Sequence, residues 1–400
     1  MTSLLKTTKK TITTTTMSIP IKIFQVDGGN IKKLMDSERM ALTCAPGGEN
    51  NRGMEIIGRM PIKGEGFTAD DIEKLGPYFK GTEYGVWVGM FTYERGVAVL
   101  DLNALSLCEK VDALGDEDQA RVLILRNWCG NWHGGLSMDE LIYKEISALR
   151  WDAEYLDPNK YRTEIVDGKE IKVRGKPMNK RARRNLCFVA GREQEPAVLE
   201  GKGTIYDLKN MEFLNKAIER LREDIADGLI AVGSKTKVII NVVEGNRYYD
   251  LKNTGIGFHG DTERVVVICL SIGGFNYPMR WQWFKNAYPI GKPIEIFLNS
   301  GDVYVMSEKA VGSDWKLRSK YTLRHAAGAS KYRDLSKWEK RRPGYEAKIK
   351  AKAAKVAAKA AAKAEKASIK TAFKKAAKKE LKKATFTADE KAAAETLANM

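Results

Sequence analysis

The chain has 400 residues, an apolar fraction of 43% and a net charge of +17, values that suit a globular protein of two or three domains. It contains no uninterrupted apolar run of about 18 residues, so we expect no membrane span. The five cysteines are scattered and show no Cys-x-x-Cys spacing, which argues against a zinc ribbon or a disulfide framework. Because no signal peptide is evident either, the sequence predicts a reducing intracellular compartment, cytoplasmic or nuclear.

The positive charge is concentrated at the ends of the chain. Residues 346–383 hold 14 lysines against three glutamates, whereas residues 26–345 carry a net charge of only +4. This distribution predicts a nearly neutral globular body with cationic appendages. Residues 1–18 are rich in threonine and lysine and contain no acid, so we expect a disordered leader there.

The next segment, residues 19–150, is predicted to be an α+β region. Apolar stretches rich in valine, isoleucine or aromatic residues predict strands at residues 84–93, 96–105 and 121–128. Apolar residues at helical spacing predict helices at residues 68–79 and 137–149. Ser137 and Glu140 form a candidate capping box for the second of these helices.

A mainly β domain is expected at residues 151–335. Its first part is polar and includes a basic cluster, Lys-Arg-Ala-Arg-Arg, at residues 180–184. An amphipathic helix is expected at residues 208–228. Short apolar stretches then predict strands at residues 237–243, 264–272, 279–284, 294–298, 303–307 and 320–324. Several short strands at this spacing are typical of a sandwich or a small barrel.

The sequence His259-Gly260-Asp261 offers a candidate metal site. Alternate residues of an extended segment share one side, so the imidazole and the carboxylate face the same way. They supply two ligands of the 2-His-1-carboxylate arrangement that holds non-haem Fe(II). The chain has two other histidines. His325, on the last predicted strand, is the better third ligand, because His133 lies far upstream in a turn-like stretch that predicts a surface loop.

Two arginines near the last strand are candidates for binding a carboxylate. Arg318 and Arg324 are six residues apart, and even spacing along a strand places both on one face. A guanidinium grips a carboxylate through two parallel hydrogen bonds. The alternative is that both arginines face solvent on an edge strand.

Four motifs in a fixed order resemble AlkB-like 2-oxoglutarate/Fe(II) dioxygenases over roughly residues 205–330. The motifs are Asn246-Arg247-Tyr248, His259-x-Asp261, Gly301-Asp302 and the pair Arg318 and Arg324. The resemblance implies a double-stranded β-helix, or jelly roll, that binds Fe(II), 2-oxoglutarate and O2. It also implies that Asn246, Tyr248 and the two arginines hold 2-oxoglutarate, and that the substrates are alkylated nucleobases.

The chain departs from this family in one place. AlkB-like enzymes have their second iron-binding histidine before the arginine pair, but residues 307–316 contain none. Either His325 takes the role, or Asp314 does, or the site has lost iron. Because His325 directly follows Arg324, their side chains face opposite ways on a regular strand. A bulge would reconcile them; otherwise Arg333 becomes the anchor.

The last segment, residues 346–400, is nearly pure alanine and lysine in its first part. Both residues favour helix, so we expect a semi-rigid, solvated tail. It resembles the C-terminal tails of linker histones and is predicted to bind nucleic acid through the phosphate backbone at residues 346–383. The alternatives are a merely solubilising tail and, for the whole chain, a non-catalytic nucleic-acid-binding or packaging protein on a degenerate oxygenase fold.

Overall fold

The computed structural model describes residues 28–49, 54–59, 62–81, 96–129 and 137–398. Three expectations therefore lie outside the described residues: the leader at residues 1–18, the strand at residues 84–93, and the position of His133.

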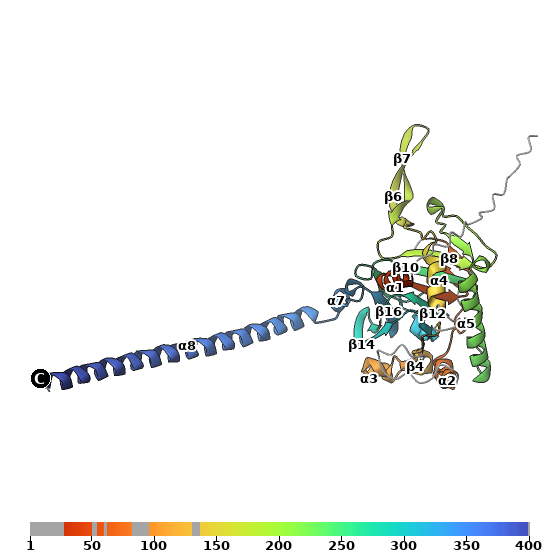
Figure 1. Ribbon diagram of the computed structural model, residues 1–400. Coiled ribbons are helices and arrows are strands. Elements are labelled where there is room, and N and C mark those ends of the chain that lie inside the picture. Colours follow the sequence, from red (N-terminus) through yellow and green to blue (C-terminus); the bar gives the residue numbers. More distant parts are fainter. Residues whose placement is uncertain (1–27, 50–53, 60–61, 82–95, 130–136, 399–400) are drawn as a thin grey trace, which may run out of the picture.

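The protein is a mixed α+β structure built on two main sheets (Figure 1). The larger sheet is antiparallel except for its last pair. Its strands, in spatial order, are β4 (Gly96–Asp101), β5 (Arg121–Arg126), β15 (Val303–Met306), β12 (Val267–Gly273), β1 (Arg39–Ala45), β10 (Val242–Tyr248), β8 (Arg184–Val189) and β9 (Ile205–Asp207). The smaller sheet consists of β11 (Gly255–His259), β16 (Thr322–Gly328), β13 (Tyr277–Lys285) and β14 (Tyr288–Leu298).

Strand β1 lies in the middle of the larger sheet, although it comes from the start of the described chain. It pairs antiparallel with β10 on one side and β12 on the other, so that Arg39 lies opposite both Tyr248 and Gly273. Position 150 is consequently no structural boundary, since strands from both sides of it form one sheet. The α+β region expected at residues 19–150 and the β domain expected at residues 151–335 therefore share one sheet.

Helices pack against the larger sheet and enclose the first hydrophobic core. They include α1 (Gly28–Ser37), α2 (Ala69–Lys80), α4 (Met138–Ser147) and α5 (Glu212–Ala231). The helices expected at residues 68–79, 137–149 and 208–228 are thereby confirmed. Thr68 and Asp71 form a reciprocal capping box at the start of α2. The capping box expected at Ser137 is absent, because its side chain makes no capping hydrogen bond.

The second core lies between the two sheets. Trp281 and Trp283 of β13 are both fully buried in it, so these rings pack the core. Short elements complete the body: β2 (Gly47–Glu49), β3 (Ile56–Gly58), α3 (Glu109–Asp112) and α6 (Glu308–Val311).

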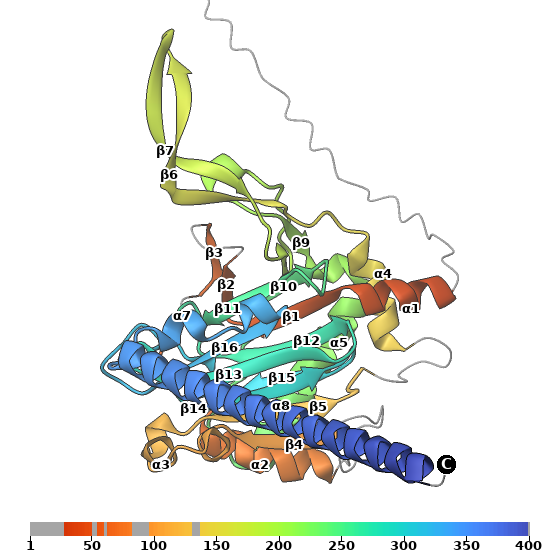
Figure 2. The same ribbon diagram turned by 90° about the vertical axis from the view of Figure 1, so that its left-hand side faces the viewer.

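Two appendages project from the body. Strands β6 (Glu154–Val166) and β7 (Lys169–Asn179) form an isolated hairpin at one end (Figures 1 and 2). The short helix α7 (Ser336–Glu339) leads into α8 (Tyr345–Ala398), which extends away from the sheets (Figure 1). Of the helices in the described part of the chain, none is both long and apolar enough to cross a membrane.

Candidate metal centre and its pocket

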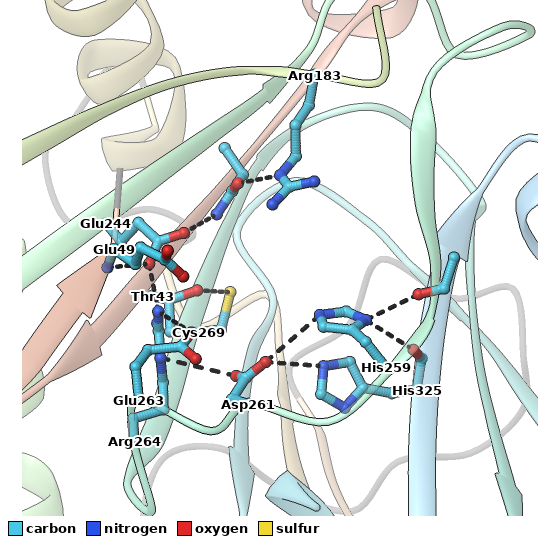
Figure 3. A network of polar contacts seen from close by, with 12 residues as sticks. Thr43, Glu49, Arg183, Glu244, His259, Asp261, Glu263, Arg264, Cys269 and His325 are labelled. Carbon is cyan, nitrogen blue, oxygen red and sulfur yellow. Dashed lines mark hydrogen bonds and ion pairs between the residues drawn. The ribbon is translucent and has the colours of Figure 1, made fainter. Parts of the chain in front are cut away.

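His259, Asp261 and His325 come together at the edge of the smaller sheet (Figure 3). The register of β11 and β16 places His259 directly opposite His325, with ring centroids 4.5 Å apart. Asp261 follows the end of β11, and its Oδ1 lies 3.4 Å from His259 Nε2 and 3.6 Å from His325 Nε2. One ligand atom from each residue lies within 4.8 Å of the others. Strand pairing thus joins residues separated by more than sixty positions.

The residues around these three groups favour the protonation states that bind a cation. His259 Nδ1 lies 2.8 Å from the carbonyl oxygen of Gly257; as the donor, it leaves the lone pair of Nε2 facing Asp261. Burial, together with the nearby His259, lowers the pKa of His325 to about 3, so its imidazole is neutral. Burial opposes ionisation of Asp261, but the nearby charge of Arg264 holds its pKa well below the usual range. A neutral imidazole beside an ionised carboxylate is the protonation state that binds metals.

Gly260 is required by the packing around this site. A Cβ at this position would lie 2.0 Å from the carbonyl oxygen of Gly312, so no larger residue fits without moving the backbone. Gly312 has a φ of 74°, a conformation that favours glycine. The two glycines let the loop after α6 close against the His-x-Asp turn.

The structure separates His325 from Arg324 as strand alternation requires. His325 faces the pocket, whereas Arg324 points to the other side of β16 among three aromatic rings. Its guanidinium carbon lies 4.1 Å from the ring centre of Phe284 and 4.7 Å from that of Trp338. Strand β16 pairs with β13 without a register shift, so no bulge reverses this arrangement.

The other carboxylate-binding candidates also lie away from the pocket. Arg318 is exposed in the loop before β16, and Arg333 forms an ion pair with Glu295. Asp314, the alternative ligand, lies 2.8 Å from Lys309 Nζ and is not part of the metal-ligand cluster. The structure therefore does not bring Arg318 and Arg324 to the site, because neither side chain faces it.

The three candidate ligands line a cavity of about 550 Å³ between the two sheets. Asn246 and Tyr248 of β10 also line it. The amide of Asn246 is held within the wall: its oxygen accepts hydrogen bonds from Arg183 and Asn185, and its nitrogen donates to Glu244 over 2.9 Å. Asn246 thus shapes the pocket, and Tyr248 is the member of this pair whose ring remains available to a ligand.

Arg39 of β1 is the cavity residue that sequence reasoning missed. Its side chain is buried, with only 1% of the residue exposed, and it lines the cavity. Nη2 donates to the hydroxyl of Ser271, and the guanidinium carbon lies 4.5 Å from the ring centre of Tyr277. Nε and Nη1 have no hydrogen-bond partner among the described residues. A buried cation with unused donors is costly, so this arrangement indicates a place for an anionic ligand.

A buried ion-pair network lies in the cavity wall beside Asp261 (Figure 3). Arg264 pairs with Glu244 and Glu263, and its Nε lies 3.7 Å from Asp261 Oδ2. The guanidinium of Arg264 outweighs the effect of burial and lowers the pKa of Glu244. This network orients Asp261 as an outer partner orients a metal ligand.

Comparison with known proteins relates the chain to a viral protein. No family model matches the chain. It is 32% identical over 295 residues to an uncharacterized protein of Acanthamoeba polyphaga mimivirus, in an alignment that covers 74% of this chain and 97% of the viral protein. The chain belongs to the family of this mimivirus protein. The relationship leaves the chemistry to be argued from the site itself.

Proposed function

We propose that this protein is an Fe(II)/2-oxoglutarate-dependent dioxygenase. The observation that carries the proposal is the convergence of His259, Asp261 and His325 in a cavity that also contains the buried Arg39, whose Nε and Nη1 have no hydrogen-bond partner among the described residues. Two imidazoles and one carboxylate are the donor set of non-haem Fe(II) oxygenases, which leaves the remaining coordination positions open. Of the AlkB-like motifs, the order of Asn246-x-Tyr248 and His259-x-Asp261 supports the same assignment, because these residues line the cavity.

The residues fit both cofactors. The two histidines and Asp261 would hold the metal, with Nε2 as the ligand atom of His259, because its Nδ1 is engaged by the backbone. Arg39 would bind the distal carboxylate of 2-oxoglutarate through its unused Nε and Nη1 donors. The tyrosines that line the same wall, Tyr248 and Tyr277, are buried and close to Arg39. This assignment replaces Arg318 and Arg324 in the cosubstrate role.

Strand connectivity supports a jelly roll whose closing strand comes from the N-terminal side. Going along the chain, β10, β12 and β15 lie in the larger sheet, while β11, β13, β14 and β16 lie in the smaller one. Apart from the β13–β14 hairpin, which stays in the smaller sheet, the strands alternate between the sheets, and this order supports a double-stranded β-helix. The place between β10 and β12 is filled by β1, which also supplies Arg39. The proposed enzyme is therefore a rearranged form of the AlkB-like fold.

In this mechanism the chain binds and orients the metal and 2-oxoglutarate, and it keeps water away from the reacting atoms. With the metal held by these residues, O2 would be the oxidant: one oxygen atom would enter succinate as 2-oxoglutarate loses CO2, and the other would hydroxylate a substrate C–H bond. Buried residues of the cavity wall, among them Tyr304 and Met306, limit the access of bulk water. Arg264 keeps Asp261 ionised and in place. An alkylated nucleobase in nucleic acid is the substrate that the motif order favours; a hydroxylated N-methyl group then leaves as formaldehyde.

A binding experiment with a redox-inactive metal tests the proposal. Calorimetric titration of 2-oxoglutarate into the chain should give one site per chain with Mn(II) present and much weaker binding without metal. An anaerobic Fe(II) sample exposed to O2 should then form succinate. Absence of both metal and 2-oxoglutarate binding would overturn the proposal in favour of a non-catalytic nucleic-acid-binding or packaging protein.

A further inference from the structure

The basic cluster at residues 180–184 lies at the mouth of the cavity, where the metal chemistry does not use it. The cluster connects the β6–β7 hairpin to β8. The carbonyl oxygen of Ala182 accepts a hydrogen bond of 2.9 Å from the backbone nitrogen of Gly255, at the start of β11. This bond fixes the cluster beside the strand that carries His259.

One of the three arginines of this cluster lines the cavity, and the other two contact Tyr249 beside it. Arg183 lines the cavity, and its Nε donates to Asn246. Arg184 lies over the ring of Tyr249, with its guanidinium carbon 4.9 Å from the ring centre. Arg181 is exposed, and its backbone oxygen accepts a 3.3 Å hydrogen bond from the hydroxyl of Tyr249. Within the part of the chain that the structure describes, none of the three forms an ion pair with a carboxylate.

Aromatic rings lie among these charges. Tyr249 is 37% exposed, and the ring of Tyr332 packs against Gly255, where a Cβ would lie 2.7 Å from Tyr332 Cδ2. Asp250, which follows Tyr249, accepts hydrogen bonds from the backbone nitrogens of Lys252 and Asn253. Glu244, which is joined to Arg183 through Asn246, is paired with Arg264. We name the set of Arg181, Arg183, Arg184, Tyr249 and Tyr332 the mouth patch.

We propose that the mouth patch docks single-stranded nucleic acid and brings an unpaired base to the opening of the cavity. Guanidinium groups bind phosphate oxygens, and exposed aromatic rings beside them stack on bases. A base can stack on a tyrosine only when the face of the base is open. Neighbouring base pairs cover that face in a duplex, so the patch favours a single strand. The mouth patch would thus hold the substrate of the proposed dioxygenase. The fate of the delivered base rests on that proposed function.

The mouth patch can be distinguished from the lysine-rich tail experimentally. The tail attracts any polyanion through charge, whereas the patch adds stacking. An uncharged substitution of Tyr249 therefore removes a contribution of the patch and leaves the tail unchanged.

The first test uses the full chain and a fluorescein-labelled 12-nucleotide single strand, with the matching duplex as a second probe. In anisotropy titrations, Tyr249→Ser should weaken single-strand binding by about five-fold or more, as loss of one stacked base does, and leave duplex binding nearly unchanged. The matched control is Tyr161→Ser, which removes a ring that is 60% exposed on the hairpin. Equal weakening by both substitutions would overturn the mouth patch as the docking surface.

The second test reverses charge. Arg181→Glu with Arg184→Glu should weaken single-strand binding about ten-fold and reduce its dependence on salt by about two phosphate contacts. The control is Lys235→Glu with Lys237→Glu, the same change of charge on an exposed segment. That segment lies near α2, since Thr236 Oγ1 donates to Asp71 over 2.9 Å, at the end opposite the hairpin (Figure 1).

Three outcomes decide the inference. Selective loss in the patch variants supports it. Equal loss in the arginine and lysine pairs reduces the effect to general electrostatics and overturns it, and unchanged affinity in all patch variants also overturns it in favour of a protein partner at this surface. Binding of 2-oxoglutarate with Mn(II) is measured in every variant, so that failure of the proposed function in the parent chain is seen separately from failure of the mouth patch.

Discussion

At the scale of single residues, the proposed site depends on His325 being a metal ligand. We expect His325→Ala to weaken Mn(II) or anaerobic Fe(II) binding by more than the roughly 10- to 100-fold that outer partners of a metal contribute. Asp314→Ala is the control, because Asp314 pairs with Lys309 away from the cluster. If Asp314→Ala loses the metal and His325→Ala retains it, the ligand assignment is wrong.

The burial of His325 also predicts a dependence of stability on pH in the metal-free chain. Its pKa is lowered to about 3 in the folded state, from an ordinary value of about 6.5. Between these values the unfolded chain binds a proton that the folded chain does not, so stability falls as pH decreases from about 6.5 towards 3. The slope attributable to one such group is at most about 1.4 kcal/mol per pH unit.

The measurement is urea unfolding in chelator at several pH values. His325→Gln should show a shallower loss of stability in the acid range than the parent chain, because Gln does not titrate. Parallel curves for the two proteins would show that His325 titrates normally in the folded state.

Arg39 is the second decisive residue. A charge-assisted hydrogen bond contributes about 1.5–3 kcal/mol, and lysine cannot reproduce the guanidinium fork. We expect Arg39→Lys to weaken 2-oxoglutarate binding by roughly 10-fold or more in calorimetry with Mn(II). Arg324→Lys is the matched control, since Arg324 faces the aromatic rings on the other side of β16. The reverse pattern would return the cosubstrate role to Arg324.

At the scale of elements, β1 holds the larger sheet together. Leu42 lies in the middle of this strand and is fully buried. Leu42→Ala should destabilise the chain by about 2–5 kcal/mol, through lost burial and the cavity left behind. Val166→Ala on the exposed tip of the hairpin should change stability by no more than about 0.5 kcal/mol. Urea unfolding measures the change in the free energy of unfolding for both variants. If Leu42→Ala changes it as little as Val166→Ala does, β1 is peripheral to the fold.

Two strands have boundaries that differ from those expected from the sequence, because pairing with distant strands sets where they begin and end. The strand expected at residues 320–324 is β16, which runs from Thr322 to Gly328. The strand expected at residues 237–243 is β10, which begins only at Val242. In both cases the strand follows the extent of its antiparallel neighbours, and distant partners are invisible in a local stretch of sequence. The β6–β7 hairpin was missed because its exposed faces carry no continuous apolar row.

At the scale of the whole molecule, the body and the tail are expected to work separately. Residues 346–383 carry 14 lysines, and nucleic-acid binding through them should weaken steeply with salt as counterions are released. Deleting residues 346–400 should remove most duplex binding in anisotropy titrations. Succinate formation should persist, because every proposed site residue precedes the tail. Equal duplex affinity with and without the tail would leave it a solubilising appendage.

The sequence by itself determined the features that depend on near neighbours. Helical spacing of apolar residues located α2 and α5, since a helix bonds within its own segment. His259 and Asp261 were found because two positions on an extended strand share a side. The cationic tail follows from composition alone.

Tertiary structure decided what depends on strands meeting across the chain. Only the pairing of β11 with β16 brings His325 opposite His259. Only the insertion of β1 between β10 and β12 brings Arg39 into the cavity, and nothing near position 39 in the sequence marks it as a ligand-binding residue. The orientation of Arg324 away from the site follows from the register of β16, because shifting a strand by one residue exchanges its two faces.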